Sequence, residues 1–184
     1  LLCEGIYVSR VDGDVITYDL RMRRPNGGDY ISPLAAHSLE HLLATYMRAS
    51  DAGDRVIYVG PMGCRTGFYL LMRGGVEDNE KNLCALKKAL TQIIEHKGKM
   101  PGAKRRECGN YRSLSVAAAK KEAMRYLAAL NATKLAIAAF VVPYIFALNP
   151  AMLFMNAAGD LFSVGVFEVA QIVLSALLGL FGIA

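Results

Sequence analysis

The sequence has few histidines and cysteines and only a mild net charge, which argues against disulfide-stabilised and nucleic-acid-binding proteins. Its 184 residues include only three histidines and four cysteines, and no two cysteines form a CxxC pair. No signal peptide opens the chain, so free or metal-bound thiols in a reducing, cytoplasmic compartment fit better than a disulfide framework. The formal net charge of +5 is mild and does not indicate a nucleic-acid partner.

Charge is nearly absent from the C-terminal part of the chain. Beyond residue 130 only Lys134, Asp160 and Glu168 are charged. Residues 135–158, which Pro143 and Pro150 interrupt, and residues 161–184 are each long enough to cross a bilayer, which takes about 20 apolar residues. We therefore predict a domain over residues 1–131, followed by a hydrophobic helical segment over residues 132–184 with two transmembrane candidates. Because the chain begins at Leu1, we also expect a segment upstream of it.

The first 131 residues have the pattern of an α+β fold. Strand-like runs come in pairs with short turns between them, and three stretches show helical spacing of apolar residues. Ser32-Pro33 supplies an N-cap and a first-turn proline for the first helix. We predict an antiparallel sheet with helices packed on one side. The strands are expected at residues 5–10, 15–21, 54–60 and 66–74, and the helices from residue 33 to about 49, at 79–97 and from about 115.

The motif HSLEH is the strongest candidate for chemistry. His37 and His41 are four residues apart and therefore share one face of a helix, where both can bind one metal ion. Glu40 flanks the same stripe. This is the inverse of the HExxH zinc-protease pattern. The alternative is a pair of unrelated surface histidines, but His96 is the only other histidine in the chain.

The four cysteines have different predicted roles. Cys108 lies in a loop and is the best candidate for a third metal ligand, with an ordinary loop thiol as the alternative. Cys64 lies in a turn next to Arg65, where a cation favours the thiolate, and is a candidate nucleophile or proton shuttle. Cys84 falls within a predicted helix, and we expect it to be a small buried hydrophobic residue. Two basic clusters are expected to be solvated: Arg21, Arg23 and Arg24, and Lys104, Arg105 and Arg106.

Four separated blocks resemble the LuxS family of S-ribosylhomocysteine lyases over residues 5–130. The blocks are YDLRMRRPN (residues 18–26), HSLEHLLATYMR (37–48), GPMGCRTGFY (60–69) and ECGNYRSLS (107–115). The resemblance implies a LuxS/metallopeptidase-like two-layer fold and a homodimer with active sites at the subunit interface. It also implies cleavage of S-ribosylhomocysteine to homocysteine and dihydroxypentanedione, the precursor of the autoinducer in quorum sensing.

The resemblance also implies roles for individual residues. His37, His41 and Cys108 match the ligands of a divalent metal, usually Fe²⁺ with Zn²⁺ or Co²⁺ as substitutes. Glu40 and Cys64 match the two acid/base groups, and Arg21 matches a substrate-contacting arginine.

Two other interpretations remain open at this point. A metallopeptidase with an inverse HxxEH site would need a carboxylate as third ligand, and Glu77 and Glu80 are the distant candidates. The second alternative is a non-catalytic fusion or fragment that carries a transporter membrane segment. Residues 133–184 resemble the membrane part of fused TRAP-type transporter permeases, chiefly in the string AFVVPYIFALNPAML (residues 139–153).

Overall fold

The protein is described from a computed structural model, which covers residues 2–148, 170, 171 and 174. Contacts divide the chain into two compact units, Leu1–Thr133 and Lys134–Ala184. The first unit contains the sheet, its hydrophobic core and every candidate site residue, and it is the unit described below.

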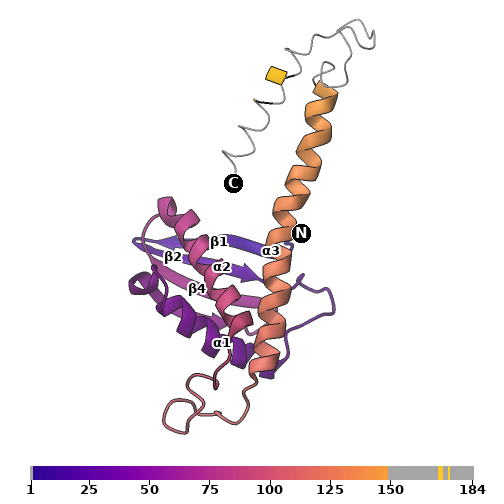
Figure 1. Cartoon of the computed structure of the whole chain (residues 1–184). Coiled ribbons are helices and arrows are strands. Elements are labelled where there is room, and N and C mark those ends of the chain that lie inside the picture. The colour runs from indigo at the N-terminus through magenta and orange to yellow at the C-terminus, as the bar shows by residue number, and fades with distance from the viewer. Residues whose placement is uncertain (1, 149–169, 172–173, 175–184) are drawn as a thin grey trace, which may run out of the picture. The chain divides into compact units, whose positions relative to one another are not determined.

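Four antiparallel strands form one sheet in the order β1-β2-β4-β3 (Figure 1). A two-residue turn joins the first two strands, and Gly13 in that turn has a φ of +58°, which glycine adopts without a steric penalty. This agrees with the short turn predicted between the first two strand-like runs. The strands are β1 (Gly5–Asp12), β2 (Val15–Arg21), β3 (Val56–Pro61) and β4 (Gly67–Arg73).

One face of the sheet forms the core. Along β2 every second side chain points to this face, and all three of these side chains are buried: Ile16, Tyr18 and Leu20. Their partners on β4 are Met72, Leu70 and Phe68, which are equally buried. The register therefore places six apolar side chains of the two central strands beneath the helices.

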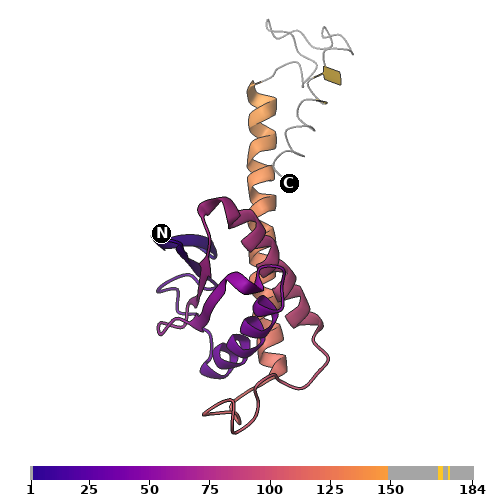
Figure 2. The same ribbon diagram turned by 90° about the vertical axis from the view of Figure 1, so that its left-hand side faces the viewer.

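Three helices cover that face, and Figure 2 shows them on the same side of the strands. They are α1 (Pro33–Arg48), α2 (Asn79–Glu95) and α3 (Val116–Leu148). Short 3₁₀ turns, η1 (Gly53–Arg55) and η2 (Val76–Asp78), precede β3 and α2. The hydroxyl of Ser32 accepts a hydrogen bond from the backbone N–H of Ala35 and caps α1, as predicted. The α+β class with an antiparallel sheet is confirmed.

The third helix begins where predicted and runs on past the predicted domain boundary at residue 131. It continues through Pro143, where we expect an interruption of the apolar stretch, to Leu148. Residues 131–148 contain no glycine and several good helix formers, which favours continuation. Within the part of the chain that the structure describes, no helix is both long and apolar enough to span a membrane. The rest of the predicted transmembrane segments, including most of residues 149–184, lies outside the described residues.

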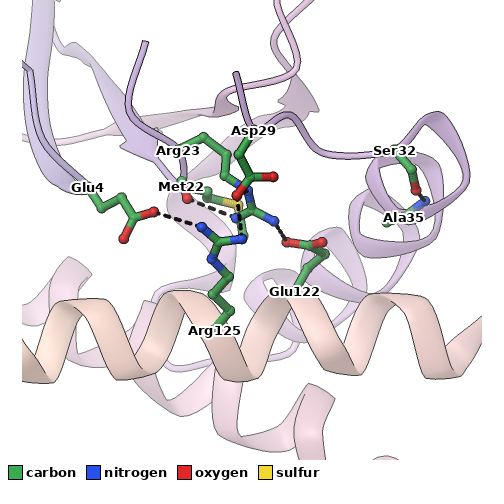
Figure 3. Close-up of polar contacts among 8 residues, drawn as sticks. All are labelled: Glu4, Met22, Arg23, Asp29, Ser32, Ala35, Glu122 and Arg125. Atoms are coloured by element: carbon green, nitrogen blue, oxygen red, sulfur yellow. Dashed lines mark hydrogen bonds and ion pairs between the residues drawn. The ribbon is translucent and has the colours of Figure 1, made fainter. Parts of the chain in front are cut away.

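A network of ion pairs links the N-terminal part of α3 to the segment that follows β2 (Figure 3). Arg23 is only 3% exposed and pairs with Glu122 of α3. Asp29 contacts the Arg23 Nε at 3.3 Å and Arg125 at 2.6 Å, and Arg125 reaches Glu4 at 3.4 Å. The expectation that Arg21 and Arg23 are solvated is therefore wrong, because both are buried against acidic partners, whereas Arg24 is exposed. The second basic cluster, residues 104–106, is exposed as expected.

Candidate metal centre

Three donor side chains converge beside α1. His37 and His41 lie one turn apart on the helix, and Cys108 approaches from the connector between α2 and α3 (residues 96–115). Their ligand atoms all lie within 4.8 Å of one another, and the Cys108 Sγ is 3.2 Å from the His37 Nε2. All three side chains are half-buried. The convergence that the sequence left open for Cys108 is therefore present.

The connector also orients both imidazole rings. The His37 Nδ1 lies 2.9 Å from the carbonyl oxygen of Ser113, and the His41 Nδ1 lies 2.9 Å from that of Pro101. A carbonyl oxygen only accepts, so each Nδ1 carries a hydrogen, and in the neutral imidazole each Nε2 is then the nitrogen with the lone pair. Hydrogen bonds of this kind fix the tautomer of metal-ligating histidines. Both rings thus present an unprotonated nitrogen to the same point.

Gly102 permits the close approach of the connector to His41. Its φ is +68°, and a Cβ built on it would lie 2.7 Å from the His41 Nδ1. Any other residue would displace either the ring or the Pro101 carbonyl. The sequence offered only a Pro-Gly pair in a loop, which indicates a turn and not a contact with a histidine.

A cavity of about 420 Å³ opens at the two histidines. Glu40 lines it together with His37 and His41, so the carboxylate between the two histidines in the motif faces the same space. Two imidazole nitrogens and one thiolate are ligands that suit Fe²⁺, Zn²⁺ or Co²⁺, and three protein ligands leave a position for substrate. The residues present therefore fit a divalent metal. The remaining wall of the cavity includes Tyr58, Val59, Pro101, Gly102 and Glu107.

Cys64 and Arg21 form a second cluster on the other face of the sheet. The Cys64 Sγ lies 3.0 Å from the Thr66 Oγ1, and Arg21 donates to the same hydroxyl at 2.5 Å. Arg21 also pairs with Asp19, and both are buried. The hydrogen bond with Thr66 lowers the pKa of the Cys64 thiol from its ordinary value; partial burial opposes this shift, and the charge of Arg21 supports it. Cys64 itself is exposed.

The structure brings the predicted residues together in two groups. His37, His41 and Glu40 line one cavity, with Cys108 close to the two histidines, and Cys64 shares a hydrogen-bonded network with Arg21. Over residues 2–148 no hydrogen bond or ion pair links the two groups directly. The sequence analysis did not include Thr66 or Asp19 among the site residues. No motif marks either residue, and only their closeness in sequence to Cys64 and Arg21 could have indicated them. Cys84 is exposed on α2, so the expectation of a buried thiol there is wrong.

The distant carboxylates do not complete a metallopeptidase site. Among the described residues, His37, His41 and Cys108 are the only group of three metal-binding side chains close enough to share an ion. Glu77 lies in η2, and Glu80 lines a separate apolar cavity against α2. The third donor is therefore the thiol and not a carboxylate.

Fold and site together define an α+β domain with a candidate site for one metal ion. A family model described as S-Ribosylhomocysteinase (LuxS) matches residues 3–136, and the chain belongs to this family. The chain is 41% identical to the S-ribosylhomocysteine lyase of Clostridium beijerinckii over 132 residues, 68% of this chain and 82% of that protein. It is 42% identical to the lyase of Borreliella afzelii over 136 residues, 71% of this chain and 85% of that protein. The family match ends at residue 136, so it does not support the permease resemblance of the C-terminal segment.

Proposed function

We propose that the chain cleaves S-ribosylhomocysteine to homocysteine and dihydroxypentanedione, and so supplies the autoinducer precursor for quorum sensing. The observation that carries the proposal is the convergence of His37, His41 and Cys108 beside Glu40 in a chain of the LuxS family. Relatives about 40% identical to it are named S-ribosylhomocysteine lyase.

The three donors would hold one divalent ion, for which we propose Fe²⁺ with Zn²⁺ or Co²⁺ as substitutes. Such an ion supplies a Lewis acid that polarises a carbonyl oxygen of the sugar. The Ser113 and Pro101 carbonyls keep the two histidines in the ligand tautomer. Metal analysis of protein purified without oxygen would identify the native ion.

Glu40 and Cys64 would carry the protons of the reaction. The carbonyl must move along the sugar until it activates the carbon next to the one that bears sulfur. Each shift takes a proton from one carbon and returns a proton to its neighbour, so one group acts as base and then as acid. In the final step a proton leaves that activated carbon, the carbon–sulfur bond breaks and the thiol of homocysteine departs. Arg21 would hold the polar substrate near Cys64.

The resemblance to the LuxS family also implies a homodimer. The sheet face opposite the helices exposes Tyr58 and Tyr69, which flank the half-buried Leu71 of β4. Exposed apolar patches of this kind mark interaction surfaces. We propose that a second copy covers this face. This would bring a partner close to the cluster of Cys64 and Arg21.

We further propose that residues 1–131 are the catalytic domain and that residues 132–184 take no part in the reaction. Every buried residue of the core cluster lies between Ile16 and Leu130. A chain cut after residue 133, where the first compact unit ends, is expected to stay in solution and to bind metal. Loss of metal from that shortened chain would contradict the division.

Incubation with S-ribosylhomocysteine tests the function. Protein loaded with iron without oxygen should release thiol, measured by titration, whereas the Cys64→Ala variant should release none and still retain its metal. No thiol from folded, metallated protein would refute the lyase activity. Loss of metal in the Cys64→Ala variant would refute the role given to Cys64. Cleavage of a generic peptide substrate would instead support the metallopeptidase interpretation.

A further inference from the structure

Thr66 joins Cys64 to the buried arginine of β2. It is the last residue before β4 and is only 3% exposed, although Cys64 two residues earlier is exposed. The Thr66 Oγ1 is 2.5 Å from the Arg21 Nη1 and 3.0 Å from the Cys64 Sγ. The Arg21 Nη2 is held by Asp19. A continuous polar chain thus runs from a buried carboxylate to a surface thiol.

Chemistry fixes the direction of the bond between Arg21 and Thr66, whereas the bond between Thr66 and Cys64 can run either way. A guanidinium has donors only, so the Thr66 oxygen must accept from Arg21. A hydroxyl has one proton, and the Thr66 proton is then available for the sulfur. A sulfur that receives a hydrogen bond is best matched as a thiolate, because bonds to charged acceptors are stronger than bonds to neutral ones.

The backbone around Thr66 holds the hydroxyl in place. The Thr66 carbonyl oxygen accepts from the N–H groups of Met22 and Arg23, each at 2.9 Å. The next residue is Gly67, where a Cβ would lie 2.2 Å from the Leu20 carbonyl oxygen. The backbone at residues 66 and 67 is therefore pressed against the end of β2, and the hydrogen bond from Arg21 holds the hydroxyl itself.

We propose that Thr66 is a positioning residue that directs its hydroxyl proton to the Cys64 sulfur and thereby holds this sulfur as an oriented thiolate. The inference deepens the proposed function, in which the thiolate takes a proton from a substrate carbon and becomes the thiol. Among the described residues, the charged groups that face the sulfur through this chain are Arg21 and, behind it, Asp19.

Alkylation of Cys64 by iodoacetamide tests this without any turnover. The full-length, metal-loaded chain is alkylated over a range of pH, and the rate at Cys64 is read by peptide mass spectrometry, which separates it from the other three cysteines. Thr66→Val removes the hydroxyl and should slow alkylation at neutral pH about tenfold, as expected for loss of one hydrogen bond to a charged group. The curve of rate against pH should move to higher pH.

Further variants distinguish loss of the Thr66 hydroxyl from a change in side-chain packing. Thr66→Ser keeps the hydroxyl and should restore the rate to near the wild-type value. Thr66→Ala removes the same hydroxyl and gives the same readout should the valine variant fail to fold. Thr17→Val is the matched control, a threonine of β2 whose replacement should leave the curve unchanged.

An alkylation curve for both Thr66→Val and Thr66→Ala that coincides with the wild type would overturn the inference. Equal slowing in Thr66→Ser would overturn it as well, because the effect would then come from packing. The proposed function fails separately: wild-type protein that releases no thiol but shows the Thr66-dependent curve would refute the lyase alone. Thiol release with an unshifted curve would refute the role of Thr66 alone.

Discussion

The proposed role of Glu40 as an acid/base group depends on its place between His37 and His41 on α1. Glu40 is half-buried in the cavity that His37 and His41 line, and it belongs to the same helical stripe. Glu107 lines the same cavity but comes from the connector, and its side chain is paired with Lys104 at 3.3 Å. Two carboxylates thus share one cavity, and only one lies between the histidines.

Replacing Glu40 by glutamine should lower the rate of thiol release by about 10²–10⁴-fold, because an amide cannot exchange a proton with carbon. Metal content should stay the same, since Glu40 is not among the three donors. The two measurements are thiol titration under saturating substrate and metal analysis of the same sample. Glu107→Gln is the control and should change the rate only a few-fold; an equal loss in both variants would mean that Glu40 has no special role.

The shared face of His37 and His41 could be predicted at the residue scale, and the burial of the arginines could not. The spacing of His37 and His41 on a helix determines that they share a face, whatever the rest of the fold. The burial of Arg23 depends on Glu122, which is 99 residues further along the chain. The contact of Arg21 with Thr66 spans 45 residues and exists only because β2 and β4 are neighbours. No local pattern reports such partners.

At the scale of elements, the connector between α2 and α3 does most to shape the metal centre. It supplies Cys108 and both carbonyls that orient the histidines. Gly102 makes this possible, since its position leaves no room for a Cβ beside His41.

Gly102→Ala should weaken metal binding about 10–100-fold, because the methyl group would displace the Pro101 carbonyl or the ring that it orients. Competition with a chromophoric chelator would measure the affinity. Gly13→Ala is a matched control: Gly13 also has a positive φ, +58°, but a Cβ there would meet nothing within 4 Å. The same loss of affinity in both variants would show that backbone strain, and not contact with His41, is responsible.

The ion pair between Arg23 and Glu122 ties α3 to the end of β2. Glu122→Leu would leave the buried guanidinium without its main partner and should lower the free energy of unfolding by about 3 kcal/mol, the lower end of the usual range because Asp29 remains 3.3 Å from Arg23. Urea unfolding would measure it. The exposed pair of Arg73 with Asp14 is the comparison.

Asp14→Asn, which breaks that surface pair, should cost less than about 1 kcal/mol. A cost for Glu122→Leu no larger than this would contradict the structural role given to Glu122. The double variant Arg23→Leu with Glu122→Leu should be less destabilised than Glu122→Leu alone, because no unpaired charge is then buried.

The sequence predicted where the strands lie more closely than how the apolar C-terminal region is organised. Alternation and turn residues located all four strands to within about two residues, because turn residues bound each run and the central strands β2 and β4 bury one face. No end could be predicted for α3, since apolar composition indicates either a membrane segment or a continuing helix and cannot distinguish them.

At the scale of the whole molecule, part of the outer face of the sheet is exposed among the described residues. Tyr69 is 40% exposed and Tyr58 49%, while the central strands bury their other face in the core. The proposed homodimer would bury this face.

Leu71→Asp should therefore convert a dimer into a monomer, because a carboxylate in the centre of an apolar interface would lose its water without a partner. Light scattering after gel filtration would give the mass. Val76→Asp is the control, since Val76 is 59% exposed on η2 and not on a strand of the sheet, and should not alter the mass. A wild-type chain that runs as a monomer, or a Leu71→Asp variant that stays dimeric, would contradict the proposed interface.

The connector also has a consequence for how the protein matures. His41 and the carbonyl that orients it are 60 residues apart in the chain, and His37 and Cys108 are 71 apart. The histidines therefore leave the ribosome well before the third donor and both orienting carbonyls have been translated. A growing chain can offer an ion only two imidazoles, which compete poorly with other cellular ligands. Metal acquisition is thus expected only after Cys108 and Ser113 have left the ribosome.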